Sequence, residues 1–199
     1  MVNLVLVGCL GYLLGSIPVG FLMGKLKGID VRTYGSGATG GTNVLRTLGP
    51  GAALVTVALD LGKGVLAAYI GQRYAGEWGY ALAGFLVAVG HSYPVWLRFK
   101  GGKSVATGGG VMLLGYPLAI LYGLMAGVLA VLPTRWVSLG SLVATAAVAL
   151  QVWLSGGPLA HTVLVLGLVV VIYVRHWENI KRIAAGKENR IGVKARPRA

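Results

Sequence analysis

The chain has 199 residues, of which 56% are hydrophobic and 12% charged, and its mean hydropathy is +0.76. These values exclude an ordinary soluble domain as the first interpretation. A membrane-spanning helix needs about 20 apolar residues, so a chain of this length can hold five to seven spans in one domain, residues 1–199. The net charge of +13 would favour nucleic acid as a partner of a soluble protein, but in a membrane protein basic cytoplasmic loops explain it. We therefore expect an all-α polytopic membrane protein that binds no nucleic acid.

Six apolar runs divide the chain, at about 3–24, 51–71, 78–97, 104–132, 137–154 and 159–174. No Lys or Arg precedes Lys25, so the first run lacks the basic start of a cleavable signal peptide. Lys and Arg concentrate in 25–46, in 98–103, at Arg135 and in the tail 176–199. The positive-inside rule places these segments in the cytoplasm and the N-terminus outside. The last residues of the basic tail are expected to be flexible.

The run 104–132 decides the number of spans. An outer N-terminus and a cytoplasmic C-terminus require an odd number of crossings. As one helix, the run would be about 43 Å long, and its glycines and Pro117 weaken that helix. Two short passes, about 104–115 and 116–132, give seven spans. A re-entrant pair would instead give five full spans with the same sidedness, and the sequence leaves this open.

Asp60 and Lys63 are the ionisable residues that lie deep within a predicted span. Their i,i+3 spacing places them on one face of a helix. Charges inside a membrane often mark a functional site, but an adjacent opposite pair can equally lock two helices together. Both interpretations stay open at this point.

A glycine-rich stretch follows the first run and is shaped for phosphate. Glycines let backbone N–H groups approach an anion closely, and small polar side chains add donors. The alternative is a flexible turn between spans. The candidate ligands are Gly35, Ser36, Gly37, Gly40, Thr42, Asn43 and Arg46.

A second candidate anion site lies at Phe99 to Thr107, where Gly101, Gly102 and Lys103 precede an apolar helix. Free N–H groups and the positive end of the helix dipole favour an anion there. The full G-x-x-x-x-G-K-[ST] spacing is absent and no strand precedes the stretch, so a nucleotide is not implied. Positive charge that orients the protein would also account for the lysines.

The third polar stretch, Arg175 to Arg182, leaves the last run. If it is helical, His176 and Asn179 share one face, which suits acid–base chemistry or orientation of a substrate. The alternative is an interfacial anchor with Trp177 at headgroup depth. His91, Ser138 and Ser141 belong to the same side of the membrane by the predicted topology. One site that holds two anions is the simplest explanation for this convergence.

The chain resembles, along about residues 10–192, the bacterial membrane glycerol-3-phosphate acyltransferases that use acyl phosphate as donor. The motifs that carry the resemblance are Gly15 to Pro18, Gly35 to Asn43, Gly90-His91 with Pro94, Phe99 to Thr107, Val137 to Leu139 with Ser141, and His176, Glu178 to Ile180, Gly186, Glu188 and Arg190. This chain has Ala38 where the family usually has asparagine, and Ser104 where it usually has glycine.

The resemblance implies a seven-helix protein of the bacterial inner membrane with its active site open to the cytoplasm. It implies acyl transfer from acyl phosphate to the 1-hydroxyl of glycerol 3-phosphate, with no metal, no coenzyme A and no obligatory protein partner. The phosphate-binding motif of the family falls on Gly101, Gly102 and Lys103. The other two motifs fall on Ser36, Thr42 and Asn43, and on His176, Asn179 and Glu188.

These features lead to a mechanistic hypothesis. Lys103, its glycines and Arg46 hold phosphate groups, while Ser36 and Ser141 orient reacting oxygens. His176 and Asn179 place or deprotonate the attacking hydroxyl, unless the departing phosphate takes the proton. An organic-phosphate transporter and a divergent paralogue with altered activity are the alternatives, although a transporter predicts ionisable residues along the midplane and a repeated half.

Overall fold

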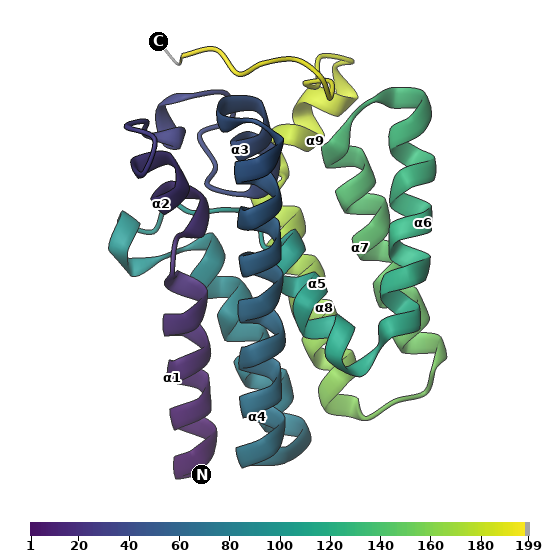
Figure 1. Cartoon of the computed structure of the whole chain (residues 1–199). Helices are drawn as coiled ribbons and strands as arrows, with labels where there is room; N and C mark the ends of the chain where they lie inside the picture. The colour runs from purple at the N-terminus through teal and green to yellow at the C-terminus, as the bar shows by residue number, and fades with distance from the viewer. Residues whose placement is uncertain (198–199) are drawn as a thin grey trace.

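The computed structural model describes residues 1–197, which are helical apart from turns, loops and one isolated bridge between Tyr34 and Pro197. The elements are α1 (Val2–Ser16), α2 (Val19–Lys25), the 3₁₀ helix η1 (Val31–Thr33), α3 (Gly41–Leu48), α4 (Pro50–Ser92), the 3₁₀ helix η2 (Val95–Leu97), α5 (Val105–Gly115), α6 (Pro117–Thr134), α7 (Val137–Leu154), α8 (Leu159–Arg175) and α9 (Trp177–Ala184). The all-α prediction is confirmed. The two ends of the chain lie at opposite ends of the bundle (Figure 1).

Within residues 1–197, four helical stretches are long and apolar enough to cross a membrane, and there are five if α8 and α9, bent by 62°, count as one. One of the four contains all of α4, which turns back at Ala75–Gly76, where the backbone leaves the helical region (Figure 1). Gly71 and Gly79 let the two halves meet, because a Cβ on Gly71 would lie 2.2 Å from the Gly79 carbonyl oxygen. The expected runs 51–71 and 78–97 are these two halves.

The run 104–132 is broken as expected, because α5 ends at Gly115 and α6 begins at Pro117. The 11 residues of α5 extend only about 16 Å, well short of the hydrocarbon thickness. Seven full crossings therefore stay a prediction, as does the sidedness. The run expected at 78–97 ends where the apolar helical stretch Pro50–Leu97 ends. Its α-helix stops at Ser92, because Tyr93 precedes Pro94 and a residue before proline is disfavoured in the α conformation, and the 3₁₀ helix η2 follows.

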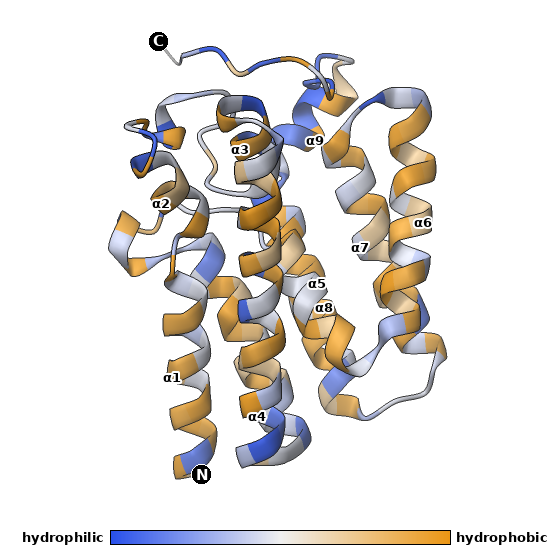
Figure 2. Cartoon of the chain, viewed as in Figure 1, coloured by the Kyte–Doolittle hydropathy of each residue, from blue (hydrophilic) through white to orange (hydrophobic). Residues whose placement is uncertain are grey.

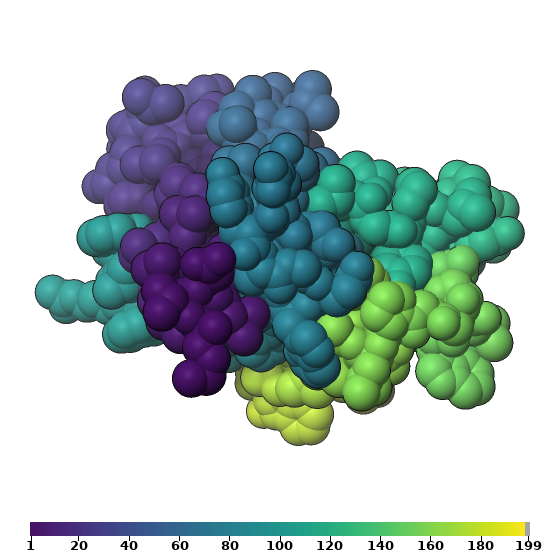
Figure 3. Space-filling model, turned by 90° about the horizontal axis from the view of Figure 1, so that it is seen from below, coloured from purple at the N-terminus to yellow at the C-terminus, as the bar shows by residue number. Residues whose placement is uncertain are grey.

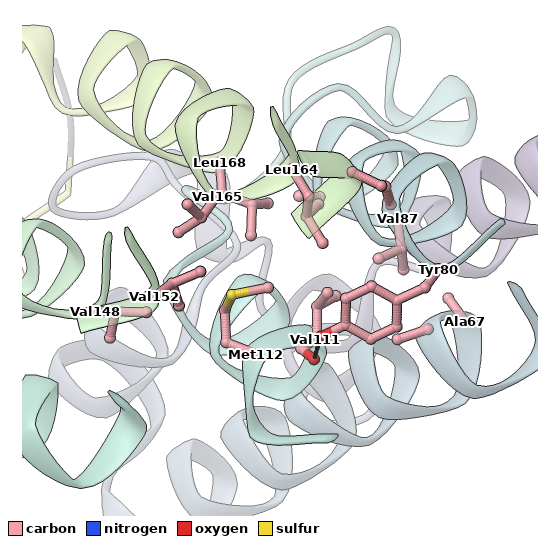
Figure 4. Close-up of a cluster of buried hydrophobic side chains, with 14 of the residues drawn as sticks. Ala67, Tyr80, Val87, Val111, Met112, Val148, Val152, Leu164, Val165 and Leu168 are labelled. Atoms are coloured by element: carbon pink, nitrogen blue, oxygen red, sulfur yellow. Dashed lines mark hydrogen bonds between the residues drawn. The ribbon is translucent and has the colours of Figure 1, made fainter. Parts of the chain in front are cut away.

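The core lies where α4, α5, α7 and α8 meet. Tyr80 packs against Val87 and Val111 (Figure 4), and its hydroxyl donates to the Val111 carbonyl at 2.7 Å. The α6–α7 hairpin is held by small residues, since a Cβ on Gly127 would lie 3.0 Å from the Gly140 carbonyl oxygen. Polar residues concentrate in the segment after α2, in α3, in α9 and in the tail, and a second polar patch lies at the turn of α4 (Figure 2). This turn and the start of α1 lie at the other end of the bundle (Figure 3).

The tail after α9 crosses the polar end of the bundle (Figure 1). The Ile191 N–H donates to the Arg135 carbonyl at 2.8 Å, and the Ala195 N–H donates to the Arg46 carbonyl at 3.1 Å. The Arg196 carbonyl accepts from the Gly35 N–H at 3.0 Å. The tail thus connects the α6–α7 hairpin with α3 and the glycine-rich loop. Of its expected flexible end, residues 198–199 lie outside the described part of the chain.

Candidate active site

The three polar stretches meet in the wall of one cavity of about 430 Å³. Its polar wall contains Ser36, Thr42, Asn43, Arg46, Lys103, His176, Asn179 and Glu188. Its apolar wall contains Met112 of α5, Ile120 and Leu124 of α6, Val148 of α7, and Val165 and Leu168 of α8. Val165 lies in α8 and His176 directly follows the last residue of this helix, so the cavity extends about 16 Å along α8 from the apolar wall to the polar one.

Asn43 shapes the glycine-rich loop from inside. Its amide donates to the carbonyls of Val31 and Ala38, each at 2.9 Å, and its side-chain oxygen accepts from the Ser36 N–H at 3.1 Å. Asn43 is therefore an organiser of the loop as well as part of the cavity wall. Ser36, Gly40, Thr42 and Arg46 also line the cavity, whereas Gly35 and Gly37 provide turns at φ +54° and +72° outside its wall.

Gly101 and Gly102 support the loop from behind the cavity. Their N–H groups donate to the carbonyls of Ser92 at 3.2 Å and His91 at 3.0 Å, so the structure does not offer these two donors to an anion as expected. The side chain of Arg175 donates to the carbonyls of both glycines. Lys103 is the member of this motif that reaches the cavity.

Replacing Gly102 with alanine should displace the loop, because the new Cβ would lie 2.0 Å from Nε2 of His91, a ring already fixed by Lys63. We expect about 100-fold lower kcat/KM in the acyl transfer that the resemblance implies, and lower thermal stability, as overpacking costs about 1–3 kcal/mol. Gly62→Ala is the control, since a Cβ there meets open space. Wild-type kinetics in Gly102→Ala would contradict this account of the loop.

Ser104, where the resemblance leads one to expect glycine, has φ +60°, a conformation that favours glycine. Its buried hydroxyl donates to the Ala88 carbonyl at 2.5 Å and lies 2.7 Å from the hydroxyl of Ser92. These contacts attach the start of α5 to α4 and compensate the unfavourable backbone. Ala38 keeps its place in the loop through its carbonyl, which accepts from Asn43.

Lys103 lies in the loop before α5, outside the membrane-spanning helices, and its ammonium group donates to Oδ1 of Asn179. Asn179 and Arg182 donate in turn to the two carboxylate oxygens of Glu188, each at 2.9 Å. Burial lowers the pKa of Lys103 to about 8; Glu188 opposes this shift, and Arg182, Arg175 and Arg46 add to it. Such an excess of positive charge favours an anionic ligand.

The lowered pKa predicts a pH dependence. Lys103 loses its proton as the pH rises through about 8, so kcat/KM, which reports ionisation of the free enzyme, should fall above that pH. Lys103→Arg should move the fall to higher pH, because arginine stays protonated. Initial rates at low substrate concentration between pH 6 and 10 measure this; an identical descending limb in both proteins would assign the ionisation to another group.

His176 lies at the bend between α8 and α9, buried in the cavity wall. Its Nδ1–H donates to the Ile172 carbonyl at 2.8 Å, which leaves Nε2 as the acceptor of the neutral ring. Ser141 also lines the cavity, and its hydroxyl donates to the Val137 carbonyl at 2.9 Å, so its oxygen can still accept. His91 contributes to the wall as well.

Sequence reasoning missed the role of Arg182, and it left open whether Asp60 has a functional role. Asp60 lines the cavity, and Arg182 fixes Glu188. The signal for Arg182 was its position three residues after Asn179, about one helical turn further along α9. No comparable signal marked the apolar wall, whose residues match those of any membrane helix.

Fold and site together define an integral membrane protein with a cavity that is lined by cationic side chains at one end and by apolar side chains at the other. A family model described as glycerol-3-phosphate acyltransferase matches residues 5–186. A glycerol-3-phosphate acyltransferase of Symbiobacterium thermophilum is 75% identical over all of both chains, and one of Carboxydothermus hydrogenoformans is 42% identical over 96% of this chain and 98% of its own. This chain belongs to the glycerol-3-phosphate acyltransferase family.

Two crystal structures of PlsY, described as an integral membrane glycerol 3-phosphate acyltransferase, have the same fold. The glycerol 3-phosphate form has a TM-score of 0.91 at 37% identity and covers 95% of this chain and 96% of its own. The lysophosphatidic acid form has a TM-score of 0.89 at 37% identity, with 95% of each chain covered.

Proposed function

We propose that this membrane acyltransferase transfers an acyl group from acyl phosphate to the 1-hydroxyl of sn-glycerol 3-phosphate. The products are 1-acyl-sn-glycerol 3-phosphate and phosphate, and the polar end of the cavity faces the cytoplasm. The observation that carries the proposal is the two-ended cavity, cationic around Lys103 and Arg46 and apolar around Ile120 and Val165. One such cavity suits two phosphate groups and one acyl chain.

The reaction forms a bond between the substrate hydroxyl oxygen and the acyl carbon, and breaks the bond between that carbon and the phosphate oxygen. Phosphate is a good leaving group, so positioning and charge stabilisation carry most of the catalysis. Lys103 and Arg46 offset the repulsion between the two phosphates, and Nε2 of His176 is the proposed acceptor for the hydroxyl proton. The departing phosphate is the other possible acceptor.

Gly109→Leu tests the apolar end. Gly109 lines the cavity, and a Cβ added there meets nothing within 4 Å, so a leucine side chain would enter the chamber without disturbing the helices. We expect kcat/KM to fall by about 10-fold or more for long acyl donors and less for short ones, as lost pocket contacts cost about 1–3 kcal/mol. Gly62→Leu, on the exposed side of α4, is the control. Equal losses for all chain lengths would place the acyl chain elsewhere.

The proposal is tested with purified protein in detergent that is given glycerol 3-phosphate and, separately, acyl phosphate or acyl-coenzyme A. Acylated glycerol 3-phosphate should form only from acyl phosphate, and hydrolysis with a 1-position-specific lipase should release the chain. Product from acyl-coenzyme A alone would overturn the proposed donor.

A further inference from the structure

Asp60, Lys63 and His91 form a buried cluster that the proposed chemistry does not use. The Lys63 ammonium group lies 2.8 Å from Oδ1 of Asp60 and 2.9 Å from Nδ1 of His91, and the same Asp60 oxygen lies 3.3 Å from that ring nitrogen. All three side chains are less than 8% exposed. The cluster joins the two halves of α4, because Asp60 and Lys63 precede the turn at Ala75–Gly76 and His91 follows it.

Lys63 also caps the break between α1 and α2. Its ammonium group donates to the carbonyls of Gly15 at 2.9 Å and Ile17 at 3.0 Å. These carbonyls lie at the end of α1, just before Pro18, and within a bilayer an unpaired carbonyl is strongly unfavourable. Lys63 therefore allows the chain to break at this depth.

The break places α2 in contact with the glycine-rich loop. Gly20 of α2 contacts the backbone of this loop so closely that a Cβ on it would lie 1.9 Å from the Thr39 carbonyl oxygen. The position of the loop 35–43 thus depends on α2, and the position of α2 depends on the break that Lys63 caps.

His91 supports the other loop. Its carbonyl accepts from the Gly102 N–H at 3.0 Å, and its ring lies against Gly102, where a Cβ would be 2.0 Å from Nε2. Lys103 follows directly and reaches the cavity. Hence the loop that carries Lys103 rests on a ring whose other nitrogen contacts Lys63.

We infer that Lys63 is a positioning residue that fixes the glycine-rich loop and the Lys103 loop at the separation that acyl transfer requires. This rests on the proposed function, because it takes both loops to hold substrate phosphates. Lys63 is not itself a phosphate ligand: its three N–H bonds already have the carbonyls of Gly15 and Ile17 and Nδ1 of His91 as acceptors. Asp60 neutralises its charge, since Oδ1 of Asp60 lies 2.8 Å from the ammonium group.

The test uses the full chain with Asp60→Asn and Lys63→Met combined, which removes the cluster without leaving an unpaired buried charge. In a Cys9→Ser background, spin labels at Thr33→Cys, in η1 just before the glycine-rich loop, and at Lys100→Cys, in the Lys103 loop, report the distance between the two segments by pulsed electron spin resonance. Both labelled positions are exposed. Thermal melting and glycerol 3-phosphate acylation are measured on the same variants, with Leu66→Met, on the exposed face of the same helix, as the control.

The double variant should melt cooperatively, show a shifted or broadened distance between the loops, and lose about 100-fold in kcat, as expected when reacting groups are misplaced by about 1 Å. An unchanged distance distribution with wild-type kcat would overturn the inference. If the double variant does not fold, the inference is also overturned, because the cluster would then be required for folding and not for the position of the loops. The distance measurement needs no substrate and therefore tests the position of the loops independently of the reaction. If the wild-type protein were inactive with acyl phosphate, only the proposed acyl donor would be wrong.

Discussion

Lys103→Ala should raise the KM for glycerol 3-phosphate or the acyl donor and lower kcat/KM by about 100-fold, since losing a charged partner from a buried anion site costs about 2–5 kcal/mol. The ammonium group lies in the cavity wall among arginines, where a phosphate can displace water and meet several donors. Its contact with Asn179 also holds that amide toward Glu188. Initial-rate kinetics with each substrate varied in turn measure the effect.

Lys100→Ala is the matched control, because Lys100 is a lysine of the same loop that is exposed and outside the cavity wall. It should retain wild-type kinetics. If Lys103→Ala left the KM of both substrates unaltered, the loop would have no direct part in phosphate binding, and Lys103 would be only a residue that orients the protein in the membrane.

His176→Ala should lower kcat by about 100-fold or more if Nε2 of His176 accepts the hydroxyl proton, the usual loss when a general base is removed. The hydrogen bond from Nδ1 to Ile172 fixes the ring with Nε2 available. Single-turnover rates in detergent, with circular dichroism to verify folding, measure the chemical step.

Two further substitutions at His176 separate a base from a positioning group. Glutamine places an amide near Nε2 and cannot take the proton, whereas asparagine keeps a donor near Nδ1 for the Ile172 carbonyl. If His176 is the general base, kcat of both variants should be as low as that of His176→Ala. Activity retained by His176→Gln would instead give the proton to the departing phosphate and leave His176 to orient the hydroxyl.

Much of the fold was predictable, because hydropathy and proline or glycine breaks act locally. The interruption near Gly115 and Pro117 was expected and is found, and the two halves of α4 lie where apolar runs were expected. The break at Pro18 was not predicted. The carbonyls that it exposes accept hydrogen bonds from Lys63, and this donor lies 48 residues from Gly15 in the sequence, so no local pattern reveals the pairing.

The site was predictable to the extent that its residues carry charge or sit in glycine-rich loops. Ser36, Arg46, Lys103, His176 and Asn179 were all expected to converge, and the structure brings them into one cavity wall. The supporting roles of Gly101 and Gly102 could be recognised only in the structure. In the sequence, a glycine that is needed to avoid a steric clash cannot be distinguished from one that exposes its N–H to a ligand. The same holds for Asp60 and Lys63, whose two interpretations the sequence left open.

The central claim is that one cavity brings acyl phosphate and glycerol 3-phosphate together. It is tested most directly by following, in one reaction of the purified protein, the release of inorganic phosphate and the formation of acylated glycerol 3-phosphate. The account predicts equal amounts of the two at every time point. With Lys103→Ala, at substrate concentrations well below KM, it predicts that both form about 100-fold more slowly. Phosphate released without acylated product, or product formed without phosphate, would contradict it.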